Sequence, residues 1–136
     1  MEDFRKAQVL WDESDTAQRL VAPVTDYVTG QALLHLRAAV AAFRKYDLVP
    51  AGEDRMFKTR VTILTARSAT VATCDDASKL REKNRRTGKV DTQLVAPPDQ
   101  RYLFVAWRLV RLSGHWAATG FSITSLPAPA ARHCQP

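Results

Sequence analysis

The hydrophobic period of this chain changes once, between residues 47 and 56, and this change limits the folds that are open to it. Before it, apolar side chains recur every three or four residues, as on one face of an α-helix. After it, apolar and polar side chains alternate, as in a half-buried strand. Helices first and strands afterwards predict an α+β domain with an antiparallel sheet, because parallel strands would need helical crossovers between them.

Three helices are expected in the first part of the chain. The first covers residues 3–13, and the longest covers residues 31–47, after a break at 27–30. Their apolar faces consist of Phe4, Ala7 and Trp11 in the first, and of Leu33, Leu36, Val40 and Phe43 in the longest. Between them, Asp15 and Thr16 are expected to cap a short helix that Pro23 bends or ends, since proline lacks the amide donor.

Strands are expected in the second part of the chain, at 56–66, 69–75, 101–112 and 116–124, with a hairpin at 79–94 that turns at 86–88. Residues 101–112 are apolar on both faces, which indicates a central strand or one whose second face meets a partner. We expect one domain over residues 1–126, a common size for a single core, and an extended tail over 127–136. A curved sheet around a long helix leaves a wedge-shaped cavity between them.

The composition limits the classes of partner. The net charge is +6 at pH 7. This charge either attracts anionic polymers or belongs to an ordinary solvated basic surface. The longest stretch without charge, 113–131, contains glycines, prolines and a histidine and is not a membrane span. Residues 1–6 lack the basic-then-apolar pattern of a signal peptide, so the chain is expected in the cytoplasm if the sequence is complete.

A basic stretch lies in the expected hairpin. Its members at period two are Lys79, Arg81, Lys83 and Arg85, and Arg86 and Lys89 extend it. Cations about 6.6 Å apart on one face of a strand could follow a polyanion. The alternative is an edge strand that its charges protect from pairing with other chains. Nucleic acid is disfavoured as the partner, because the chain carries no recognition-helix, ribonucleoprotein or zinc-finger motif.

The two cysteines, Cys74 and Cys134, are either free thiols or one disulfide across a loop of about 60 residues. Together with three histidines they do not have metal-ligand spacing, so no metal site is expected, and no cofactor motif is present.

Four short pieces stand in a characteristic order, at 27–33, 69–76, 114–116 and Cys134. Together with the order of helices first and strands afterwards, these pieces resemble the nuclear-transport-factor-2-like (cystatin-like cone) superfamily. More narrowly, they resemble a group of extracytoplasmic domains from actinobacteria. The resemblance implies a cone of N-terminal helices packed on a curved antiparallel sheet. It also implies a disulfide between Cys74 and Cys134, export to the cell envelope, and a signal or membrane anchor upstream of residue 1.

Members of this superfamily include cyclases and dehydratases that use a histidine or an aspartate at the floor of the cavity. The corresponding candidates here are His35, Asp75 and Arg108, and the candidate pocket residues are Trp11, Tyr27, Phe104 and Arg108. Asp75 and Asp76 are expected at the end of a strand, where neighbours face opposite ways, so they do not form a carboxylate pair in one pocket. Arg108, if buried, needs an anionic partner such as Asp26, Asp75 or a ligand.

Nothing in the sequence identifies a reaction. We therefore expect a non-catalytic extracytoplasmic accessory or interaction domain, with a cavity for a small hydrophobic or anionic ligand and a homodimer through the sheet face. The first alternative is a small cyclase-, dehydratase- or isomerase-like enzyme that uses the cavity. The second alternative is polyanion binding through residues 79–89.

Overall fold

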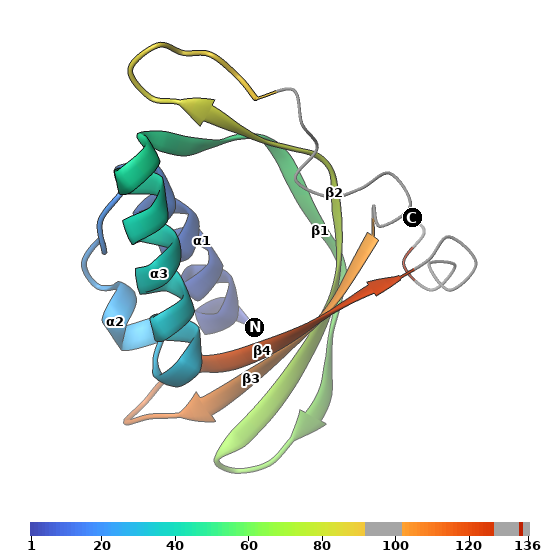
Figure 1. Ribbon diagram of the computed structural model, residues 1–136. Coiled ribbons are helices and arrows are strands. Elements are labelled where there is room, and N and C mark those ends of the chain that lie inside the picture. Colours follow the sequence, from blue (N-terminus) through green and yellow to red (C-terminus); the bar gives the residue numbers. More distant parts are fainter. Residues whose placement is uncertain (92–101, 127–133, 135–136) are drawn as a thin grey trace.

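The computed structural model describes residues 1–91, 102–126 and 134 (Figure 1). Three helices come first, namely α1 (Glu2–Ala17), α2 (Val24–Tyr27) and α3 (Gly30–Tyr46). Four strands follow, namely β1 (Leu48–Leu64), β2 (Ser68–Asn84), β3 (Tyr102–Arg111) and β4 (Trp116–Leu126). The strands form one antiparallel sheet in the order β1-β2-β3-β4. The prediction of an α+β fold, with helices packed against an antiparallel sheet, is confirmed.

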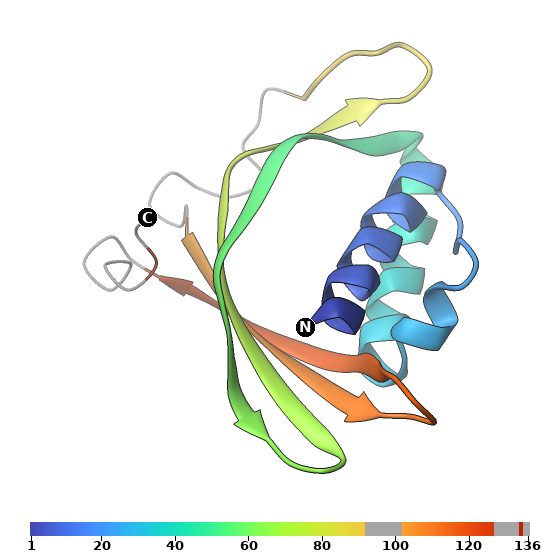
Figure 2. The same cartoon turned by 180° about the vertical axis from the view of Figure 1, so that it is seen from behind.

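The sheet is curved, and the helices lie on its concave side (Figures 1 and 2). The core between the two layers is aromatic. Trp107 of β3 lies 5.8 Å from Phe4, 5.9 Å from Trp11 and 4.7 Å from Phe121, measured between ring centroids. Strand β3 occupies an interior position, as its two apolar faces predict, since β2 and β4 flank it.

The N-terminal helices differ from the prediction. Helix α1 continues to Ala17, so Asp15 lies in its last turn and caps no second helix. The helix ends at Gln18, which takes the left-handed conformation at φ 54°. Helix α2 begins only after Pro23 and has four residues. Capping residues favour helix starts, but here the hydroxyl of Ser14 donates to the Leu10 carbonyl inside α1 at 2.7 Å.

Strand β2 is also longer than predicted. The segments 69–75 and 79–84 form one continuous strand, so Asp75 and Asp76 lie in its middle and not at its end. Its second half pairs mainly with β1, where Glu82 is opposite Pro50 and Lys83 is opposite Val49. The expected turn is present, but only one bridge, Lys83 to Val90, follows it within the described residues. Polar side chains here do not end the strand, because β1 supplies the backbone partners.

Strand β1 begins at Leu48, eight residues before the predicted strand. Pro50 lies within it, which is permitted because β1 is an edge strand and needs no amide donor on its outer side. Gly52 has φ 78°, and a Cβ atom there would collide with the carbonyl oxygen of Lys79. Only glycine fits this position without strain. Residues 49–52 come soon after the end of the long helix and therefore belong to the start of β1.

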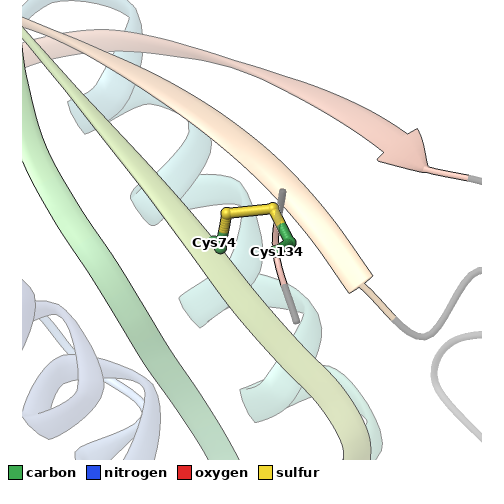
Figure 3. Close-up of a disulfide and its surroundings, with 2 residues drawn as sticks. All are labelled: Cys74 and Cys134. Carbon is green, nitrogen blue, oxygen red and sulfur yellow. A yellow bond between two sulfur atoms is a disulfide. The ribbon is translucent and has the colours of Figure 1, made fainter. Parts of the chain in front are cut away.

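The disulfide between Cys74 and Cys134 is confirmed, with an S–S distance of 2.01 Å and a Cα–Cα distance of 5.3 Å (Figure 3). Cys74 is opposite Phe104 in the register of β2 and β3, one residue out of phase with the inward pair Thr73 and Val105. The bridge therefore lies on the sheet face away from the helices. Cys134 is fully buried, so the bridge fixes this residue against the sheet.

Candidate functional site

A cavity of about 280 Å³ lies between the helices and the paired strands β1 and β2. The described residues that line it are Trp11, Asp12, Asp15, Phe43, Pro50, Asp54, Leu80, Arg81 and Glu82. They come from all four neighbouring elements, α1, α3, β1 and β2. This cavity corresponds to the wedge that the sequence predicts between a curved sheet and a long helix.

The helical wall of the cavity follows from the spacing in α1. Trp11 and Asp15 are four residues apart and share one face of the helix, and Asp12 lies beside them. The end of this helix is held in place by Gln18, whose Nε2 donates to the carbonyl oxygens of Phe43 at 3.2 Å and Leu48 at 2.7 Å. The ends of α1 and α3 therefore meet at the cavity.

The strand wall depends on the pairing of β1 with β2. Pro50 is opposite Glu82, and Gly52 is opposite Leu80. Between them Arg81 lines the cavity, and its Nη1 donates to the backbone carbonyls of Ser78 at 3.1 Å and Leu80 at 2.7 Å. The guanidinium is thus bound to backbone rather than to a carboxylate.

Asp15 is the buried acidic group of this cavity. Its residue is 8% exposed, and its Oδ1 has no hydrogen-bond partner among the described residues. Burial, with a contribution from the negative charge of Asp12, raises its pKa from 3.8 to about 7, while a hydrogen bond with Trp11 acts in the opposite direction. A carboxyl group in this state changes charge near neutral pH.

Two further aspartates, Asp54 and Asp75, also have raised pKa values. Burial raises the pKa of Asp75 to about 6, against a hydrogen bond with Thr73, and the charge of Asp54 adds to the shift. Burial also raises the pKa of Asp54 to about 6, with smaller contributions from Asp12 and Asp76. Asp54 is exposed, whereas only 8% of the surface of Asp15 is accessible to solvent.

Asp15→Asn is expected to stabilise the protein at pH 8 by roughly 2 kcal/mol and to change little at pH 4. Between pH 3.8 and about 7 the folded protein keeps a proton on Asp15 that the unfolded chain has lost. Stability from this group is therefore present at low pH and falls as the pH rises toward 7. The expected gain in stability is smaller than the full pKa shift implies, because the buried amide of Asn still has part of the desolvation cost of the carboxylate.

Urea unfolding at pH 4, 6 and 8 measures this effect, with Glu13→Gln as the control, since Glu13 is exposed on the same helix. A stabilisation that is the same at all three pH values would contradict the assignment to Asp15.

The structure does not bring the four predicted pocket residues together. Trp11 lines the cavity, but Phe104 and Arg108 lie on the outer face of β3, out of phase with the buried Val105 and Trp107. Tyr27 does not line this cavity but lies at the end of α2, where its hydroxyl accepts a hydrogen bond from Lys6 Nζ at 3.0 Å. The prediction was wrong for Phe104 and Arg108 because alternation defines two faces of a strand without showing which face meets the helices.

The three catalytic candidates are also apart. His35 is exposed on α3, with its ring 5.1 Å from that of Phe121. Arg108 is exposed, and its Nη2 donates to Gln31 Oε1 at 3.2 Å, so it needs neither Asp26 nor Asp75 as a partner. Asp75 is buried in the middle of β2. General acid–base work needs groups within hydrogen-bond reach of one another, and these three are not so placed.

The basic stretch does not present one row of cations. Lys79 is 4.0 Å from Glu53, Arg81 lines the cavity, and Arg85 Nη1 donates to Gln18 Oε1 at 3.2 Å. The remaining members are Lys83, Arg86 and Lys89. The pairing of β1 with β2 is regular from Leu48–Asn84 to Glu53–Lys79, so the alternation within the stretch is kept. It is these separate contacts that leave the stretch without a free row of cations.

Sequence reasoning missed Asp12, Asp15 and Asp54. The spacing of Trp11 and Asp15 on one helix was a signal, since it places a carboxylate beside an apolar stripe. Asp54 had no such signal, because its position follows from the pairing of β1 with β2. Among the described residues, no group of three or more His, Cys, Asp or Glu side chains is placed to hold a metal ion.

Comparison with known proteins shows the fold alone. No family model and no curated protein matches the chain. The chain is similar in structure to the intermembrane space region of the chloroplast protein ARC6, known from a crystal structure, with a TM-score of 0.54. The match covers 90% of this chain and 94% of that chain, at 12% sequence identity.

No helix in the described part of the chain has the length and apolar character to cross a membrane.

Proposed function

We propose that the protein is a non-catalytic extracytoplasmic binding domain of the nuclear-transport-factor-2-like type, which holds a small ligand in the cavity between α1, α3, β1 and β2. The observation that carries this proposal is the cavity itself, whose lining combines the buried and incompletely bonded Asp15 with the aromatic side chains of Trp11 and Phe43. Ligand sites typically combine such an apolar wall with a few convergent polar groups.

The disulfide supports the extracytoplasmic part of the proposal. Disulfides persist in oxidising compartments and are rare in the cytosol, so the Cys74–Cys134 bridge is compatible with an exported protein. The helices on a curved antiparallel sheet support the cone-like fold type.

An enzyme of the same fold is the alternative, and one observation favours it. A pKa of about 7 for Asp15 suits a general base at neutral pH. The other titratable groups of the described lining are the carboxyl groups of Asp12, Asp54 and Glu82 and the guanidinium of Arg81, and no serine, cysteine, histidine or tyrosine lies among them. We therefore favour binding over catalysis.

A cavity-filling substitution tests the proposal. Leu80→Trp is expected to abolish the binding of small molecules that a fragment screen by ligand-observed NMR detects on the wild-type protein. Overpacking at this position is expected to cost about 1–3 kcal/mol of stability, so folding is checked by circular dichroism. Leu34→Trp is the matched control, because Leu34 is 65% exposed on α3.

Fragments that bind Leu80→Trp as well as the wild type would place ligand binding outside this cavity. A screen without any bound fragment would also overturn the proposal, and chemical turnover of a bound fragment would favour the enzyme.

Two other roles remain predictions. A homodimer would use the outer sheet face, where Phe57 and Tyr102 pack with ring centroids 6.1 Å apart. Polyanion binding would use the exposed Arg86 and Lys89, since the other basic residues are divided among different contacts.

A further inference from the structure

We propose that the cavity selects a small organic cation, a primary ammonium group on a short apolar or aromatic body, with the ammonium placed at Asp15. This inference rests on the proposed binding function and adds the chemical class of the ligand. It departs from the hydrophobic or anionic ligand that the sequence predicts.

The charge of the cavity is opposite to that of the chain. The protein carries a net charge of +6, yet the described lining contains four acidic residues and one basic residue. The acidic residues are Asp12, Asp15, Asp54 and Glu82, and the basic residue is Arg81. Arg81 keeps its positive charge, and its Nη1 is bound to two backbone carbonyls. One guanidinium against four carboxyl groups leaves the lining acidic, which attracts a cation.

The helix ends add negative potential at the same place. The last turn of α1 contains no basic side chain, and Asp15 lies within it. Gln18 Nε2 donates to the Phe43 carbonyl oxygen at 3.2 Å, so the C-terminal ends of α1 and α3 lie next to one another. A helix C-terminus behaves as a partial negative charge and favours a cation within its last turn. Arg44 and Lys45 in the last turn of α3 are exposed and do not line the cavity.

Asp15 is the group that points to a ligand. It is more than nine-tenths buried, it lines the cavity, and its Oδ1 has no hydrogen-bond partner among the described residues. Burying a carboxylate oxygen without a partner is costly. An ammonium donor in the cavity would supply a charge-assisted hydrogen bond and offset that cost.

The remaining wall suits the body of an organic cation. Trp11, Phe43, Pro50 and Leu80 provide apolar and aromatic surface next to the carboxylates. An ammonium group near the face of an indole ring gains a further cation–π attraction. The volume of about 280 Å³ lies just below the usual range for ligand pockets, so the ligand should be small.

Binding is expected to be coupled to the loss of a proton. The raised pKa of Asp15 means that part of this carboxyl is protonated at pH 7, and a bound cation favours the ionised form. The charged groups that share the cavity with it are Asp12 on α1, Asp54 on β1, and Arg81 and Glu82 on β2, and Asp75 of β2 interacts with Asp54. Burial raises the pKa of Asp12, Asp54 and Asp75 too, so affinity should fall as the pH drops from 7 to 5.

Isothermal titration calorimetry with three probes of one shape tests the inference: phenethylamine as the cation, 2-phenylethanol as the neutral form and phenylacetate as the anion. We expect phenethylamine to bind the wild type at least about tenfold more tightly than the other two, since a bond to a charged group is worth at least that much. Asp15→Asn should weaken phenethylamine binding at least about tenfold, whereas Glu13→Gln should leave it unchanged. Titrations in two buffers of different ionisation enthalpy should show proton release on binding.

Equal binding of the alcohol or tighter binding of the anion would overturn the cation inference and leave the proposed binding function intact. Phenethylamine affinity that Asp15→Asn leaves unchanged would overturn the role of Asp15. Failure of phenethylamine to bind the wild type would also overturn the inference, while the fragment screen with Leu80→Trp decides the proposed function separately.

Discussion

Replacing Cys74 and Cys134 together by alanine is expected to lower the free energy of unfolding by about 4 kcal/mol. The bridge joins residues 60 positions apart, and closing a loop of that length removes much of the conformational entropy of the unfolded chain. Both cysteines are also buried, so their removal leaves a small packing defect. A loss of this size is a large fraction of the stability of a domain.

Urea unfolding of the double variant measures the loss, and the wild type in reductant is the matched comparison. Reduction removes the bridge but keeps both sulfur atoms, so the difference between the two samples separates packing from the cross-link. The variant itself should not respond to reductant. Thiol alkylation followed by intact mass provides an independent check, because both cysteines should be blocked until they are reduced. Free alkylation of protein prepared under oxidising conditions would contradict the bridge.

Trp107→Ala is expected to cost about 3–5 kcal/mol of stability, the usual range for removing a large aromatic side chain from a core. Trp107 is 7% exposed and contacts three other aromatic rings, those of Phe4, Trp11 and Phe121. Its removal leaves a cavity between the sheet and the helices that these neighbours cannot fill without moving. Because Trp11 also lines the ligand cavity, ligand binding should weaken in the same variant.

The control for this prediction is the next residue along β3. Arg108 lies on the outer face and is exposed, so Arg108→Ala should change the stability by no more than about 0.5 kcal/mol. Chemical unfolding monitored by circular dichroism measures both variants. A large loss on Arg108→Ala with a small loss on Trp107→Ala would mean that the two faces of β3 are assigned the wrong way round.

The order of the elements was predictable because it depends on local periodicity. The stripe of α3 includes the buried Leu36 and Val40, and a residue's neighbours along the chain are enough to reveal such a stripe. The interior position of β3 was predictable for the same reason, since both faces of that strand are apolar. The pairing of Cys74 with Cys134 came from the resemblance of the sequence to a known superfamily, and the residues alone left it open.

The extents of α1, β1 and β2 were not predictable from local patterns. Asp75 and Asp76 stand where a strand would be expected to end, and Pro50 and Gly52 stand where a helix stops and a loop would follow. In the structure, β1 and β2 pair over these positions, and the bonds across the pair stabilise a backbone that neither segment favours alone.

By itself, the sequence determined an α+β domain of N-terminal helices on an antiparallel sheet, together with a cavity between the two layers, because periodicity and chain order are local properties. Tertiary structure alone decided what lines that cavity. Asp15, Phe43, Asp54 and Arg81 are far apart in the chain and meet only through the packing of α1 and α3 on β1 and β2. The burial that raises the pKa of Asp15 is likewise a product of that packing, since desolvation depends on which surfaces come together and not on the neighbours of a residue in the sequence.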